Sequence, residues 1–338
     1  MKQHWVFILA CWLWVLVCVR SSTATLVPPF DLDALTRDSD VIAAGRIADI
    51  RGQGPVTLEA TSSPVAARQM LAHLDVERII RGEGPAGQLF FRFTVPEAPI
   101  GYAGIQTGQF GVFFLRKVTQ GYEVLDPYYP FVVAAPGEPE GTGNYVDQVT
   151  AEVAHVFDSA TATADTRLQA VLVLRTVRTS LAGRSLKAAA SGRDLRARAW
   201  ALSSLLARND ITLLDSALEL MLSRDPKIDQ NLKDVVAFGL RDGVKDPKAV
   251  PAASRLLLAK DVALRRCAAA ALRATQDTAA IEPLKLALFD TDQQVRYLAV
   301  VGLGEITRQD DWTPSVDYFN QNETRFLQHW REWSKSQN

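Results

Sequence analysis

The spacing of hydrophobic and polar positions changes near the middle of the chain. Between residues 40 and 127 the apolar residues form short runs, several of them alternating, that are separated by Gly- and Pro-containing turns. Such runs predict β-strands. Beyond residue 145 the apolar residues recur at every third or fourth position, which predicts amphipathic helices. The fold class expected from the pattern is therefore multidomain β plus α.

At least five strands are expected in the first part of the chain, over 40–50, 74–82, 88–95, 109–117 and 121–127. Short strands at this spacing are typical of a small β-barrel or sandwich. Gly45 within the first run suggests a bulge or a close backbone approach. Residues 54–70 lack a regular pattern and predict a long loop or a bent strand.

The helical part contains an internal repeat of 31 to 35 residues. Five windows align: TRLQAVLVL (166–174), ARAWALSSL (197–205), LKDVVAFGL (232–240), LRRCAAAAL (264–272) and VRYLAVVGL (295–303). Their second position is always basic, as Arg167, Arg198, Lys233, Arg265 and Arg296. Three residues before the last four windows stands an aspartate suited to cap a helix N-terminus: Asp194, Asp229, Asp261 and Asp292. Three windows are followed by a second amphipathic stretch, so about five helical pairs are expected to stack into an α-solenoid.

The segments 249–275 and 280–306, AVPAASRLLLAKDVALRRCAAAALRAT and AIEPLKLALFDTDQQVRYLAVVGLGEI, resemble short HEAT repeats of the lyase-associated type. The resemblance covers about 165–310 and implies that the basic residue of each window bonds the neighbouring unit or loop. The family also places an aspartate six residues before that basic residue. Here only Asp290 holds the place, before Arg296; the equivalents are Thr161, Gly192, Lys227 and Ala259. We therefore expect the capping aspartates to replace that ladder.

Three segments of the first part, SDVIAAGRI (39–47), LDVERIIRGEGP (74–85) and GQFGVFFLRK (108–117), resemble secreted bacterial domains related to netrin-like and tissue-inhibitor-like OB barrels. The resemblance implies a barrel fold. It does not imply inhibition, because those inhibitors insert a cysteine-led N-terminus into a metalloprotease and this chain has no such cysteine. The expected domains are residues 25–135 (β-rich), 136–144 (linker), 145–310 (solenoid) and 311–338 (helical cap). Phe326, Trp330 and Trp333 would close the stack from the cap.

Residues 1–24 have the pattern of a secretory signal peptide. Lys2 precedes an apolar run over 5–19, and Ser22 and Ala24 fit the small-residue cleavage site. The protein is therefore expected to be secreted or periplasmic, with no stable membrane span after cleavage; a lipoprotein or an uncleaved anchor is the alternative. Cleavage would leave Cys267 as the one cysteine, which excludes an intramolecular disulfide.

The charge balance and the absence of catalytic motifs argue against nucleic-acid binding, a metal site and enzymatic activity. With 37 basic and 38 acidic residues the chain lacks the basic excess that nucleic-acid binding needs. His73, His155 and His329 stand far apart in sequence and no metal-ligand spacing occurs, so no metal or cofactor is expected. There is no GxSxG, and Cys267 holds a core position of its window. The chain is therefore not expected to be an enzyme.

The favoured function is a non-catalytic scaffold that binds a protein or peptide of the cell envelope along the solenoid. The candidate binding residues are Arg266 and Arg273, on the outward side of their helix, and Tyr128, Tyr129 and Phe131 in DPYYPFV (126–132). Aromatic packing between the two domains is the alternative for the last three. Two other functions stay open: a carbohydrate- or envelope-binding β domain with the solenoid as spacer, and an accessory factor to an envelope enzyme.

Overall fold

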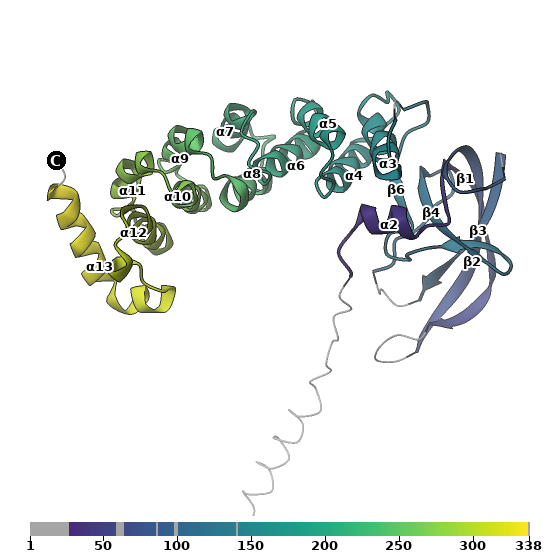
Figure 1. Ribbon diagram of the computed structural model, residues 1–338, viewed down its shortest axis with the longest axis horizontal. Coiled ribbons are helices and arrows are strands. Elements are labelled where there is room, and N and C mark those ends of the chain that lie inside the picture. The colour runs from purple at the N-terminus through teal and green to yellow at the C-terminus, as the bar shows by residue number, and fades with distance from the viewer. Residues whose placement is uncertain (1–26, 59–63, 86, 98–100, 140, 337–338) are drawn as a thin grey trace, which may run out of the picture. The chain divides into compact units, whose positions relative to one another are not determined.

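The computed structural model describes residues 27–58, 64–85, 87–97, 101–139 and 141–336 (Figure 1). The signal peptide predicted over 1–24 lies outside these residues. Contacts divide the chain into two compact units. Among the described residues, the first comprises those within 27–31, Arg37–Gln109 and Phe113–Pro130, and the second those within Leu32–Thr36, Phe110–Val112 and 131–336. The chain is thus a β-plus-α protein.

The β part is one mixed sheet of six strands within the described residues: β1 (Val41–Leu58), β2 (Val65–Arg81), β3 (Gly87–Pro96), β4 (Phe110–Val118), β5 (Gly121–Val124) and β6 (Phe131–Val133). The order is β1-β2-β3-β5-β4-β6, and β1 also pairs with β4. The β3–β5 pair is parallel, whereas β1–β2, β2–β3 and β4–β5 are antiparallel. All five strands expected from the sequence are present; β6 is an addition.

The segment over 54–70 does not form a long loop, because its described residues belong to the ends of two paired strands. Leu58 on β1 pairs with Val65 on β2. Residues 51–55 are exposed, so this end of the hairpin has no core face to impose an alternation. The expectation at Gly45 is confirmed: a Cβ there would lie 2.2 Å from the Asp75 carbonyl oxygen.

Helix α2 (Leu32–Asp38) precedes the sheet, and helices α3 to α13 follow it. Their bounds are α3 Tyr145–Ala154, α4 Ala164–Leu174, α5 Ser180–Ala190, α6 Leu195–Leu206, α7 Leu214–Leu222, α8 Gln230–Gly243, α9 Val250–Leu256, α10 Val262–Thr275, α11 Ile281–Ala287, α12 Gln293–Thr307 and α13 Val316–Ser336. Helices α4, α6, α8, α10 and α12 contact one another in succession, and each contains one of the repeat windows. Helices α5, α7, α9 and α11 each pack on the next of these, so that Figure 1 shows them along one side of the row.

Repeated polar residues fix the ends of these helices. The side chains of Asp194, Asp229, Asp261 and Asp292 each accept a backbone N–H of the helix that follows. The basic window residues donate to carbonyls just beyond the preceding helix: Arg167 to Ser159, Lys233 to Ser223, Arg265 to Ala259 and Arg296 to Asp290, at 2.6 to 3.2 Å. A cation there satisfies orphan carbonyls and the negative end of the helix dipole. Arg198 differs, because its Nε is buried without a partner among the described residues.

Helices α6 and α8 approach each other through two glycines on α8. A Cβ on Gly239 would lie 2.4 Å from the Ser203 carbonyl oxygen, and one on Gly243 would lie 2.2 Å from the Ala207 Cα. Both contacts are with backbone, which cannot rotate away. The small residues of the repeat therefore set the distance between the helices.

Replacing Gly239 with alanine should lower the free energy of unfolding by about 1–3 kcal/mol, because the added methyl overpacks against the α6 backbone. Gly183→Ala is the matched control, since a Cβ at this helical position on α5 meets no atom within 4 Å. It should stabilise the protein by about 0.5–1 kcal/mol through the lost backbone freedom of glycine. Urea unfolding followed by circular dichroism measures both. Equal effects of the two substitutions would contradict the close approach.

Helix α13 contacts both α11 and α12, at the C-terminal end of the row. Phe326 and Trp330 are buried there, and Trp333 is half-buried. The backbone of Asn322 is non-helical, so the helix is kinked at that residue. In the described part of the chain no helix combines the length and apolar character needed to cross a bilayer.

Candidate functional site

The two arginines proposed as binding residues take part in ion pairs between neighbouring helices. Arg266 on α10 donates from Nε and Nη2 to the Asp292 carboxylate, at 2.9 and 2.6 Å. Arg273 donates from Nε to Glu305 on α12 at 2.8 Å. The hydrogen bond from Arg266 holds the pKa of Asp292 below its ordinary value. It outweighs burial, which alone would raise that pKa. Both guanidinium groups therefore join α10 to α12. Their binding role stays a prediction, and any partner would meet them as members of these ion pairs, with the Arg266 and Arg273 side chains still 42% and 36% exposed.

The aromatic residues of 126–132 are half-buried and engaged. The Tyr129 hydroxyl donates to the Pro28 carbonyl at 2.6 Å, and the Tyr129 ring meets Phe30 edge-on at 5.2 Å. Tyr128 packs edge-on against Tyr102 at 5.0 Å. Phe131 begins β6 and is likewise half-buried. These contacts hold Tyr128 and Tyr129 in place within the described residues, and the proposed binding role of the three aromatic residues stays a prediction.

Cys267 lies in the core of the helical row, with 3% of its surface exposed. Burial raises the pKa of its thiol to about 11. The thiolate is the reactive form of cysteine, and near neutral pH this thiol stays protonated. Cys267 is thus placed for packing and not for nucleophilic attack.

Native protein should react with iodoacetamide at Cys267 far more slowly than the unfolded chain at pH 8, by a factor of about 100 or more, because both access and thiolate fraction are low. The measurement is intact mass after timed alkylation with and without denaturant. Rapid modification of the folded protein would show that the thiol is reachable and ionised.

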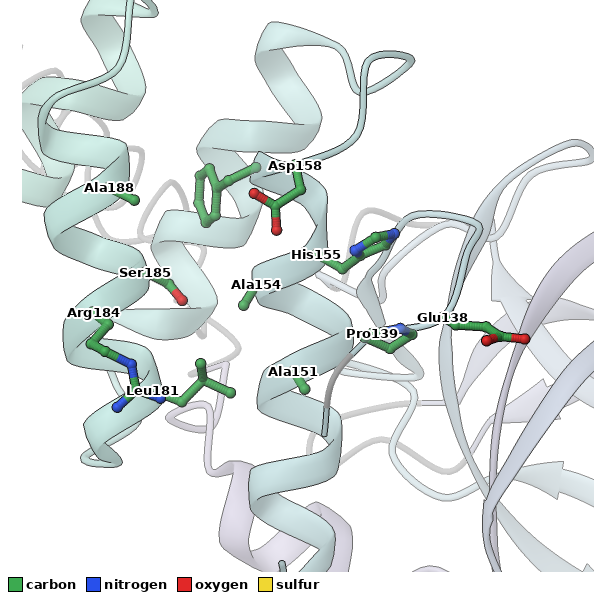
Figure 2. Close-up of a pocket in the computed structure, with 11 residues that line it drawn as sticks. Glu138, Pro139, Ala151, Ala154, His155, Asp158, Leu181, Arg184, Ser185 and Ala188 are labelled. Carbon is green, nitrogen blue, oxygen red and sulfur yellow. The ribbon is translucent and has the colours of Figure 1, made fainter. Parts of the chain in front are cut away.

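A hollow of about 570 Å³ lies between α3, the 3-10 turn His155–Phe157 and α5. Figure 2 shows Ala151 and Ala154 on one wall and Ser185 and Ala188 on the other, with Asp158 and Arg184 near its ends. The apolar residues that line it are small or partly covered, and its charges are of both signs. It therefore supplies no large exposed anchor of the kind that carries most interface energy.

An apolar groove opens between α9 and α11. We name it the α9/α11 groove; its lining residues are Ser254, Arg255, Leu257, Leu258, Pro283, Leu286, Ala287 and Asp290, around about 290 Å³. Leu258 is 81% exposed and Leu286 71% exposed, and Phe289, three residues after Leu286, is 65% exposed. A cluster of large exposed apolar side chains in a concave place marks an interaction surface.

The groove follows from the way α9 and α11 pack. Each has seven residues and packs on its own partner, α9 on α10 and α11 on α12. On α11, Leu284 and Leu288 stand four residues apart and are buried against the row. Leu286 lies between them in sequence and therefore on the other side of the helix. Leu286 is therefore an apolar residue on the exposed side of α11, where an amphipathic helix normally has a polar residue.

The groove is lined by two charged side chains, Asp290, which forms an ion pair, and Arg255, which does not. Asp290 accepts from Nε and Nη2 of Arg265, at 2.7 and 3.0 Å, and from the Asp292 backbone N–H at 2.8 Å. Burial alone would raise the pKa of Asp290, but these hydrogen bonds and the charge of Arg265 outweigh it and hold the pKa below its ordinary value. The side chain of Arg255 is exposed and forms no hydrogen bond or ion pair with any described residue.

The cap helix α13 borders the same region through Arg331. Its guanidinium lies 4.5 Å from the centre of the Phe289 ring and donates from Nη2 to the Leu288 carbonyl at 2.7 Å. This cation–π contact fixes one face of Phe289 while much of the ring stays in solvent.

Comparison with known proteins finds no family model that matches the chain and no curated protein that matches its sequence.

Proposed function

We propose that this protein is a non-catalytic binding scaffold that holds a protein or peptide partner in the α9/α11 groove. The observation that carries the proposal is the exposure of Leu258 and Leu286 in one concave site. Covering a leucine side chain contributes about 1.5–3 kcal/mol. Two such leucines within one groove form an exposed apolar patch that a partner's side chains can cover.

The proposal includes a finer description of the fold. We propose that α3 to α12 form a HEAT-like solenoid, supported by the recurrence of a capping aspartate and a carbonyl-binding cation in successive helical pairs. In a solenoid each unit contacts only its neighbours and the outer helices present grooves. We also propose that the β1–β4 pairing closes the sheet into an OB-like barrel.

The proposed partner belongs to the cell envelope or the secreted space, because residues 1–24 have the pattern of a signal peptide. The non-catalytic part of the proposal is supported by Cys267, whose burial and raised pKa suit packing. The groove itself offers no nucleophile and base in contact: its polar lining groups are Ser254, Arg255 and the paired Asp290.

Site-specific photo-cross-linking in the native host tests the proposal. A benzophenone side chain at position 286 should yield one discrete cross-linked protein, whereas the same probe at position 238 should not. Phe238 is the matched control, since it is exposed but lies on α8, away from the groove-lining residues. Adding Leu258→Asp should remove the product, because a charge replaces an anchor in the groove. The same product from both positions, or none from 286, would contradict the proposal.

A further inference from the structure

The charges around the α9/α11 groove are unequal in one respect: Asp290 and Glu282 are held in ion pairs, whereas the side chains of Arg255 and Lys260 are not. Asp290 is held by Arg265, and Glu282, next to Pro283 at the groove, receives a 2.8 Å hydrogen bond from Lys285. Arg255 in the groove and Lys260, two residues beyond Leu258, are exposed and pair with no described residue. One unpaired positive charge, that of Arg255, therefore lies in the groove beside the exposed leucines.

From this complementarity, and resting on the proposed function, we infer that the segment bound in the groove is an acidic, aliphatic-rich peptide segment of a partner protein. Its large aliphatic side chains cover Leu258 and Leu286, and a carboxylate pairs with Arg255. Complementary charge at an interface sets which partner binds and how fast it associates. A guanidinium can bind a carboxylate through two parallel hydrogen bonds, which adds direction to the charge.

An anionic membrane surface would also suit exposed leucines beside cations. Two features favour a peptide. The leucines line a concave groove of about 290 Å³, which receives side chains, whereas a flat bilayer needs a protruding apolar face. The chain as a whole carries a net charge of -1, so it gains little from the broad attraction that draws polybasic segments to anionic lipid.

The test uses the full chain and synthetic fluorescent peptides of equal length, with the same leucine positions and with Glu, Gln or Lys at the remaining positions. Fluorescence anisotropy should show the Glu peptide binding about tenfold more tightly than the Lys peptide, with the Gln peptide between them and the difference shrinking at high salt. Arg255→Gln should bring the Glu and Lys peptides together, and Arg255→Glu should reverse their order. Both changes are at an exposed side chain, so the fold is retained.

The Leu286→Asp variant distinguishes the proposed groove from the proposed acidic partner. If the parent protein binds the Lys and Glu peptides equally well and Leu286→Asp abolishes binding of both, the acidic partner is excluded but the groove remains the binding site. If the Glu peptide binds and Leu286→Asp has no effect, the groove is not the site and the proposed function fails with the inference. Binding to vesicles of phosphatidylglycerol that is lost in Leu286→Asp, with no binding of any peptide, would overturn the inference in favour of a lipid surface.

Discussion

The Trp330→Ala variant should be less stable than the parent protein by about 3–5 kcal/mol, the usual cost of removing a fully buried aromatic side chain. Trp330 has no exposed surface, and its ring packs edge-on against His329 and Trp333 at 5.0 and 5.3 Å. Helix α13 closes the end of the helical row through α11 and α12. Losing its central anchor exposes the terminal pair, and thermal and urea unfolding measure the cost.

Trp330→Phe is the matched control. The indole Nε1 of Trp330 is buried and has no hydrogen-bond partner among the described residues, so phenylalanine removes an unsatisfied donor while keeping an aromatic ring. The variant should lose at most about 1.5 kcal/mol. If Trp330→Phe costs as much as Trp330→Ala, the stabilising feature is a polar contact of the indole and not the packing of the cap.

Asp290→Asn should cost about 3 kcal/mol at pH 7, because it leaves the nearly buried guanidinium of Arg265 without its counter-ion. The two side chains are 11% and 14% exposed. A second change, Arg265→Met in the same chain, should restore part of the loss, since the unpaired charge is then absent. Additive costs of the two changes would contradict a direct pair.

The effect of Asp290→Asn should also depend on pH with a defined sign. The pKa of Asp290 is lowered in the folded protein, so its contribution to stability is fully present above the ordinary carboxyl pKa of about 3.9 and is lost as the pH falls through the folded value. The stability difference between parent and variant should therefore be constant near neutral pH and should narrow below about pH 3.9. A difference that widens toward acid would show that the carboxylate is not stabilised by Arg265.

Much of the helical order is readable from the sequence, because each window combines a core stripe with polar residues that have a local task. The window LRRCAAAAL lies within α10, and the small residue at its eighth position recurs as Gly239 in α8. A capping aspartate acts within one turn of its own helix, so its position in the sequence is sufficient information. The 31-to-35-residue period then gives the order of the helical pairs.

Interactions between units are harder to predict, because they depend on which side chains of the next helix arrive opposite. The outward spacing of Arg266 does not reveal that Asp292, a predicted cap, also reaches its guanidinium. Asp290 likewise meets Arg265 of the preceding window, in addition to offering its backbone carbonyl to Arg296. The expected replacement of the ladder by caps thus understated what these carboxylates do.

The α9/α11 groove is hard to predict from the sequence for a related reason. The stretch IEPLKLALF reads as amphipathic, and its leucines all count toward a core stripe. Leu286 is out of phase with Leu284 and Leu288, and this surplus leucine is the one signal that sequence offers. Whether it is covered depends on the neighbouring helix. Helix α2 and strand β6 are not among the predicted elements either, and β6 has only three residues, too few to show a period.

Hydrogen–deuterium exchange of the free chain and of its complex with the protein cross-linked from position 286 locates the bound partner on the helical row. A partner in the α9/α11 groove should slow exchange over 250–258 and 281–290 and leave α3 and α5 unchanged. Slower exchange over 145–190 or 230–243, with 250–290 unaffected, would place the partner elsewhere on the helical row and contradict the α9/α11 groove as the binding site.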